Sequence, residues 1–151
     1  IDGFHGDSAR TFPVGRVSEE AMRLIEATKE SFERGYAQVT AGLRIGDIGA
    51  AVEVCAREHG FSVVRRYVGH GVGHELHESP EVPNYGTPGR GARLYPGMVI
   101  AIEPMVNAGV PEVRELPDGW TVKTADGKLS AHYENTVALT DEGPMILTAA
   151  K

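Results

Sequence analysis

The residues best suited to chemistry lie between His70 and Glu78, where three histidines and two glutamates stand among glycines. Two further acids lie downstream in strand-like apolar runs: Glu103, which precedes a proline, and Glu134. One imidazole and several carboxylates held on rigid strands form a mixed nitrogen and oxygen ligand set that suits Mn, Fe, Co or Zn. The sequence therefore predicts metal-assisted chemistry.

Each of these residues also has an ordinary structural interpretation. His70 lies between two glycines, which allow close approach of the backbone to a neighbour or a ligand, but a surface-loop histidine is the alternative. Glu103 and Glu134 could be strand acids that face water; if they are buried, a cation must offset the cost. His74 is not expected to be a ligand, because the glycines around it disfavour a helix and its spacing to the next histidine misses the helical zinc pattern. His77 precedes a turn and could form a catalytic hydrogen bond.

The chain has 151 residues, enough for one domain with a real core, and a net charge of −6. This charge argues against a nucleic-acid partner held by phosphate contacts. The apolar runs are too short for a membrane span, and no secretory signal is visible. Cys55 is the single cysteine, so no disulfide can form within the chain. Its helical surroundings predict a buried, inert thiol, which fits a cytoplasmic protein.

Two helices must help to position these residues. The first is expected to begin after Ser18 as N-cap and to stop near Gly42. The second is expected to begin with Asp47 as N-cap and to stop at His59-Gly60. Strand patterns surround the helices, at residues 1–12, 61–68, 98–103, 120–122, 129–139 and 145–147. This order predicts an α+β fold, with the helices on one face of a curved, mostly antiparallel sheet.

Several segments, taken in order, resemble the type I methionine aminopeptidases. They cover nearly the whole chain, at residues 2–7, 69–73, 77–78, 102–105 and 118–134. The short connection between His77 and Glu103 leaves no room for the helical insertion of the type II enzymes. The run that contains Trp120 favours this family over the proline peptidases, which share its fold and metal ligands.

The resemblance implies half of a pita-bread fold, in which two similar halves enclose two divalent metal ions in a central cleft. It implies metal ligands at Asp7, His70, Glu103 and Glu134, of which Asp7 and Glu134 bridge both metals.

The resemblance also assigns residues to the substrate and the reaction. His77 is expected to hydrogen-bond the substrate near the scissile bond, and Glu103 to shuttle the proton of the attacking water. Tyr67, Leu76 and Trp120 fall where the family lines its methionine pocket. The implied reaction is hydrolytic removal of the N-terminal methionine from nascent polypeptides. A proline-specific aminopeptidase and a non-catalytic pita-bread peptide-binding module are the alternatives.

One departure from the family pattern concerns the start of the chain. The family has another aspartate ligand shortly before the position that matches Asp7, and here that position would precede Ile1, which is not an initiator methionine. The resemblance therefore implies that residues 1–151 form one domain, the C-terminal metal-binding half of a catalytic domain whose N-terminal half is absent. We expect one complete protein shell for a metal, weak or no activity of this chain alone, and a complementing N-terminal fragment as a partner.

Overall fold

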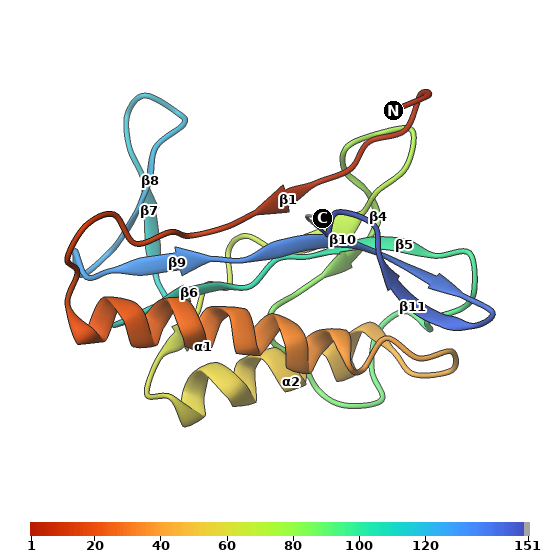
Figure 1. Cartoon of the computed structure of the whole chain (residues 1–151), viewed down its shortest axis with the longest axis horizontal. Helices are drawn as coiled ribbons and strands as arrows, with labels where there is room; N and C mark the ends of the chain where they lie inside the picture. The colour runs from red at the N-terminus through yellow and green to blue at the C-terminus, as the bar shows by residue number, and fades with distance from the viewer. Residues whose placement is uncertain (150–151) are drawn as a thin grey trace.

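Two helices lie along one face of an antiparallel sheet in the computed structural model, which describes residues 1–149 (Figure 1). α1 spans Glu19–Tyr36 and α2 spans Ile45–Glu58. Every strand pairing in the described range is antiparallel. The α+β architecture expected from the order of elements is confirmed. Neither helix in this range combines the length and the apolar content of a membrane span.

The strands form three sheets. The main sheet has the order β1-β10-β5-β3-β4, with β11 also paired to β10. Its strands are β1 (Ser8–Ala9), β3 (Gly69–Gly71), β4 (Glu78–Val82), β5 (Val99–Ile102), β10 (Glu134–Thr140) and β11 (Gly143–Ile146). A second sheet has the order β2-β6-β9, with β2 (Ser62–Val63), β6 (Met105–Asn107) and β9 (Ser130–His132). β7 (Val113–Glu115) and β8 (Val122–Thr124) form a separate hairpin.

The helix ends depart from the sequence pattern in two places. Ser18 caps α1 as expected, because its Oγ accepts a hydrogen bond from the backbone N–H of Ala21 at 3.1 Å. α1 ends at Tyr36, well before Gly42, since tight turns follow at once. The prediction of Asp47 as N-cap of α2 is wrong. Its carboxylate instead reaches back from within the first turn and accepts the N–H of Arg44 at 2.7 Å.

Three predicted strands are shorter than expected or shifted. β1 and β2 have two residues each, in place of the longer runs at residues 1–12 and 61–68. The second run ends early because Arg65 and Arg66 turn outward to form ion pairs with glutamates. β8 begins only at Val122, because a turn precedes it. In this turn the Asp118 carboxylate accepts hydrogen bonds from the backbone N–H groups of Trp120 and Thr121.

A two-stranded antiparallel ribbon runs through both larger sheets. One side of it consists of β5 and β6 and the other of β9 and β10, and we call it the β5–β10 ribbon. The predicted strand over residues 129–139 is divided at Tyr133 into β9 and β10, yet Met105 pairs with His132 and Ile102 pairs with Asn135. These two pairs share one register, so Pro104 lies opposite Tyr133. Proline has no N–H to donate, which interrupts the ladder at this point without shifting it.

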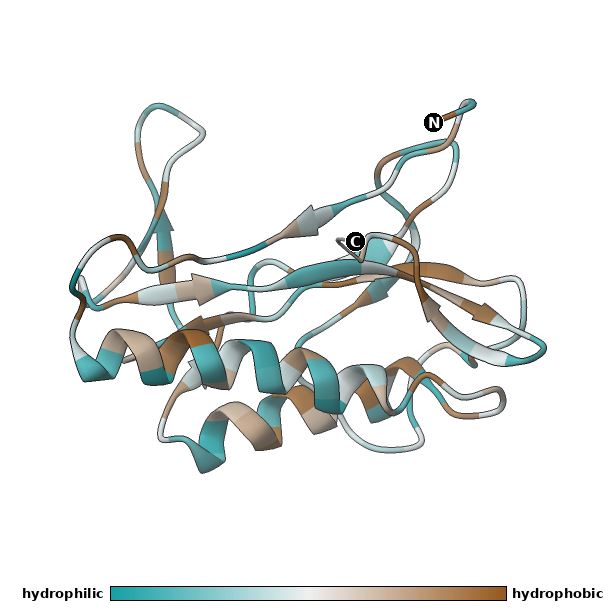
Figure 2. Ribbon diagram, in the orientation of Figure 1, coloured by the Kyte–Doolittle hydropathy of each residue, from teal (hydrophilic) through white to brown (hydrophobic). Residues whose placement is uncertain are grey.

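The hydrophobic core lies between the helices and this ribbon. Hydrophobic and hydrophilic residues alternate along both helices, as Figure 2 shows. Phe32 of α1 and Ile48 of α2 pack against strand residues such as Ile100, and all three are almost completely buried. A neighbouring cluster contains Leu24 and Val52. Burial of each such side chain contributes about 1.5–3 kcal/mol, which provides the rigid support that the strands need.

Glycines allow β3 to approach its neighbours closely. A Cβ atom at Gly69 would lie far inside van der Waals distance of the carbonyl oxygen of Ala101 in β5, and one at Gly71 would lie as close to the carbonyl oxygen of Ser79 in β4. The expected close backbone approach on both sides of His70 is therefore present, and it is made to the adjacent strands.

We predict that Gly69→Ala lowers the free energy of unfolding by about 2–4 kcal/mol, because the new methyl group must separate β3 from β5. Urea unfolding of both proteins measures this difference. Gly6→Ala is the matched control, since a Cβ there meets only a side-chain methyl at an ordinary 3.6 Å. Equal stability of the two variants would contradict the packing described.

Candidate metal centre

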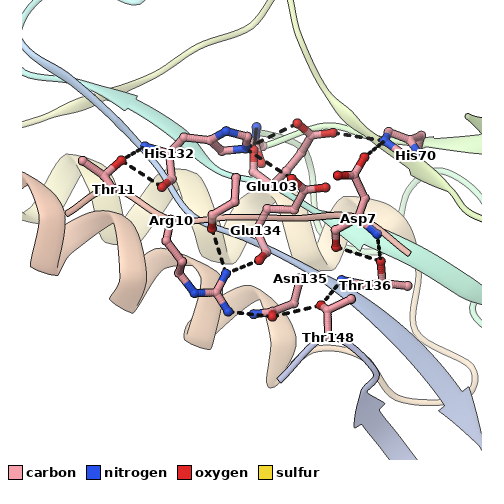
Figure 3. A network of polar contacts seen from close by, with 12 residues as sticks. Asp7, Arg10, Thr11, His70, Glu103, His132, Glu134, Asn135, Thr136 and Thr148 are labelled. Carbon is pink, nitrogen blue, oxygen red and sulfur yellow. Dashed lines mark hydrogen bonds and ion pairs between the residues drawn. The ribbon is translucent and has the colours of Figure 1, made fainter. Parts of the chain in front are cut away.

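Three carboxylates and two imidazoles converge above the β5–β10 ribbon (Figure 3). Asp7, His70 and Glu134 offer ligand atoms that all lie within 4.8 Å of one another. Glu103, His132 and Glu134 form a second such group, so Glu134 belongs to both. Four residues that are far apart in sequence and were predicted as ligands thus meet in one place.

The register of the ribbon brings the two glutamates together. Ile102 pairs with Asn135 and Met105 with His132, so Glu103 lies directly opposite Glu134 across the two strands. Side chains of directly opposite residues share one face of an antiparallel pair. The side chains of Glu103 and Glu134 are only 14% and 5% exposed, so neither is a strand acid that faces water.

Asp7 is attached to the same strand from the start of the chain. β1 pairs with β10, where Ala9 lies opposite Glu134. The hydroxyl of Thr136 accepts the N–H of Asp7 at 2.8 Å and donates to its carbonyl oxygen at 2.9 Å. These two hydrogen bonds hold the Asp7 backbone beside Glu134, although the two residues are separated by 127 positions in the sequence.

His70 presents its Nε2 atom to the carboxylates. It lies in β3, with its side chain 9% exposed, and Nε2 is 3.4 Å from Glu103 Oε1 and 3.9 Å from Asp7 Oδ2. Its Nδ1 lies 2.9 Å from the carbonyl oxygen of Gly71. A carbonyl can only accept a hydrogen bond, so Nδ1 carries a proton and Nε2 is the ring atom that faces the acids.

His132 was not among the residues singled out from the sequence. Its Nε2 lies 3.5 Å from Glu103 Oε2 and 3.9 Å from Glu134 Oε2. This nitrogen is buried and has no hydrogen-bond partner among residues 1–149. The strand alternation that puts His132 on the same face as Glu134 was the signal that could have identified it.

Arg10 was also missed, and it supports the site from behind. Its guanidinium donates to the backbone carbonyl of Glu134 and to Asn135 Oδ1, and it stacks 3.9 Å from the centre of the Tyr133 ring. These contacts fix the backbone of β10 next to the carboxylates. No local sequence pattern identifies such a contact, because it joins the two ends of the chain.

The predicted substrate residues lie in different surroundings. The ring of His77 is exposed and packs 4.2 Å from the ring of His70, centre to centre. Tyr67 lines a cavity of about 310 Å³ that also reaches His132. Leu76 and Trp120 do not line this cavity and are 38% and 88% exposed, so their place in a substrate pocket stays a prediction.

The charges at the centre are strongly unbalanced. Burial, followed by the nearby charges of Glu103 and Asp7, raises the pKa of Glu134 to about 8. Arg10 opposes this rise only weakly, since its hydrogen bonds go to other groups. Glu134 Oε1 is buried with no hydrogen-bond partner in the described part of the chain. Carboxylates and imidazoles crowded in this way fit a divalent cation, which would replace a proton at Glu134.

Comparison with known proteins agrees with this chemistry. The model of metallopeptidase family M24 matches residues 1–141. The chain is 58% identical over 151 residues to a methionine aminopeptidase of Clostridium perfringens, covering all of this chain and 61% of that protein. The methionine aminopeptidase structure from Thermotoga maritima superposes with a TM-score of 0.95 at 45% identity, over 98% of this chain and 59% of its own. A recombinant prolidase from Thermococcus sibiricus gives a TM-score of 0.76 at 27% identity, over 99% of this chain and 35% of its own.

We predict that the metal-free chain loses stability as the pH rises from about 5 to about 8. The folded state keeps a proton on Glu134 that the unfolded chain, with an ordinary carboxyl pKa, has released over this range. The loss should be on the order of 3 kcal/mol. Glu134→Gln cannot ionise and should remove this part of the pH dependence in urea unfolding with a chelator present. Glu142→Gln, an exposed change in the turn after β10, should leave it in place. The same pH dependence in Glu134→Gln and in the unmodified chain would show that this carboxyl is not the cause.

Proposed function

This chain belongs to metallopeptidase family M24, and on that basis we propose that it provides the metal-binding half of a methionine aminopeptidase. Residues 1–151 would form one domain, equivalent to the C-terminal half of the catalytic domain. Since the chain spans 61% of the Clostridium perfringens relative, the rest of the cleft would come from a further segment or a complementing fragment. The observation that carries the proposal is the meeting of Asp7, His70, Glu103 and Glu134 at one place, where Glu134 Oε1 and His132 Nε2 are buried without a hydrogen-bond partner among residues 1–149.

The four residues would hold a divalent ion of the Mn, Fe, Co or Zn class, with Asp7 and Glu134 shared with a second ion. Their donor set of three carboxylates and one imidazole supports this assignment, as does the absence of thiolates. His132 Nε2 is one more donor within reach. The bound ion would supply Lewis-acid activation of water and of the scissile carbonyl.

The residues themselves would carry the proton and the oxyanion. Glu103 would accept a proton from the attacking water, whose oxygen bonds to the carbonyl carbon, and pass it to the leaving amine as the C–N bond breaks. His77 would donate a hydrogen bond to the carbonyl oxygen as negative charge develops there. Its packing against the His70 ring supports this position beside the metal shell.

The substrate would be the N-terminal methionine of a nascent polypeptide, in the cytoplasm. The apolar cavity beside Tyr67 and Met105 suits a flexible thioether, and Leu76 and Trp120 would approach it when the cleft is complete. The prolidase similarity keeps a proline-specific aminopeptidase as a second candidate, because the fold is shared. A non-catalytic peptide-binding module is the third.

We predict that Glu134→Ala lowers the affinity for Mn²⁺ by at least about 100-fold, because the residue belongs to both groups of ligand atoms. Isothermal titration calorimetry measures this loss. Mn²⁺ is the suitable probe, since it prefers oxygen and nitrogen donors. Glu142→Ala removes one exposed carboxylate from the turn after the same strand and should bind Mn²⁺ as the unmodified chain does. Unchanged affinity in Glu134→Ala would remove the proposed site.

We predict that His77→Ala lowers kcat/KM for a Met-Ala-Ser peptide by about 100-fold in the native polypeptide that carries this chain, with Mn²⁺ affinity unchanged. His74→Ala is the matched control. His74 is also exposed, but it contacts Gly3 and Phe4 instead of the carboxylates, so its loss should change the rate less than about twofold.

The same assay separates the candidate functions. Faster cleavage of an Ala-Pro peptide than of Met-Ala-Ser would favour the proline-specific enzyme. Tight Mn²⁺ binding without turnover of either peptide would favour the binding module. The purified 151-residue chain alone should be weak or inactive, because an incomplete cleft admits water to the site.

A further inference from the structure

A second group of metal-ligating side chains lies between the two helices. Cys55 lies in the last turn of α2, His59 is the C-cap residue one turn later, and Glu30 faces them from α1. One ligand atom from each of the three lies within 4.8 Å of the other two. None of these residues belongs to the carboxylate centre on the β5–β10 ribbon.

The three side chains form a site that opens to solvent on one side. Cys55 is fully buried, and its Sγ makes a weak contact with the Ala27 carbonyl oxygen at 4.0 Å. His59 Nε2 and Glu30 Oε2 are 2.9 Å apart, and their side chains are 36% and 40% exposed. An ion could therefore enter past the imidazole and the carboxylate and reach the thiol at the base.

The charges around this site become net negative when Cys55 loses its proton, which favours a cation. The Arg34 guanidinium forms ion pairs with Glu30 Oε1 at 2.6 Å and with Glu58 Oε2 at 2.5 Å. The other oxygen of Glu30, Oε2, is therefore directed at His59. Arg23 also lies at this site, because its guanidinium donates to the backbone carbonyl of His59 at 3.4 Å. The two carboxylates and the two guanidinium groups sum to zero, and a thiolate at Cys55 would make the charge −1. The nearby Glu33 is paired with Lys29 at 3.6 Å and adds no net charge.

We propose that Glu30, Cys55 and His59 bind a thiophilic divalent cation of the Zn²⁺ type, which links α1 to α2. Zinc–sulfur bonds of about 2.3 Å and zinc–nitrogen bonds of about 2.0–2.1 Å place tetrahedral donors roughly 3.3–3.6 Å apart. The thiol therefore needs to approach the other two donors by about 1 Å at most, while His59 Nε2 and Glu30 Oε2 separate slightly from 2.9 Å. Water would complete the four-coordinate shell. The thiol proton leaves to solvent as the sulfur–metal bond forms.

Burial raises the pKa of the Cys55 thiol to about 11 when no metal is bound. The thiol is therefore protonated near neutral pH and inert until an ion displaces its proton. Because the ion competes with that proton, affinity at this site should increase with pH. The burial and the raised pKa agree with the buried, inert thiol expected from the sequence. Under the proposal, this thiol is a metal ligand.

The test uses the fact that Cys55 is the only cysteine in the chain. A near-ultraviolet thiolate-to-cobalt charge-transfer band in a Co²⁺ titration can come only from this residue, whereas the carboxylate centre has oxygen and nitrogen donors alone. We expect the unmodified chain to develop this band in proportion to a single site. Cys55→Ser should lack it, and Glu134→Ala should retain it.

Two partly exposed ligands provide the decisive variants, because their substitution leaves the helix core intact. His59→Gln and Glu30→Gln should each weaken the Co²⁺ affinity read from the band at least tenfold. Glu33→Gln, on the same helix as Glu30, should change it less than twofold. Excess Zn²⁺ should abolish the band by displacement and raise the urea midpoint of Glu134→Ala. Absence of the band in the unmodified chain, or a band that survives His59→Gln with unchanged affinity, would overturn the proposal.

Discussion

Repulsion among three carboxylates that neighbouring strands hold together is the interaction on which the rest of this structure depends. The β5–β10 register places Glu103 opposite Glu134, and the hydroxyl of Thr136 holds Asp7 beside them. The carboxylates would repel one another less if they moved apart, but the backbone hydrogen bonds between the strands keep them together. Only a proton or a cation can offset the charge, and burial together with the charges of Glu103 and Asp7 raises the pKa of Glu134 to about 8.

The remainder of the fold keeps this arrangement rigid. Phe32, Ile48 and the strand residues around Ile100 form a core under the ribbon, and its burial stabilises a geometry that is unfavourable at the site itself. Gly69 and Gly71 bring β3 close enough for His70 to reach the acids. A ligand set built before the metal arrives loses little conformational entropy on binding, which is how strands serve a catalytic site.

Much of this could be predicted from the sequence, and the remainder shows where local patterns fail. Periodicity predicted two helices on one face of an antiparallel sheet, and the types and spacing of the acids and histidines predicted a metal site. His132 and Arg10 were missed because their partners are set by strand register and by contacts between distant segments. Asp47 was assigned to the wrong cap position, since propensity alone cannot tell a cap from a carboxylate that reaches back to it. Trp120 is exposed in the β7–β8 hairpin, and its place in a methionine pocket, which the resemblance implied, stays a prediction.

The unbroken register across Pro104 has an evolutionary consequence. In a two-stranded ribbon, a length change of one residue reverses which face every later side chain occupies. A single residue inserted or deleted between Ile100 and Glu103 would turn the carboxylate of Glu103 to the opposite face, toward the hydrophobic core, and break its pairing with the opposite strand. We therefore expect homologous chains to conserve the length of this ribbon even where its residues differ, and to accept insertions and deletions at the tip of the β7–β8 hairpin.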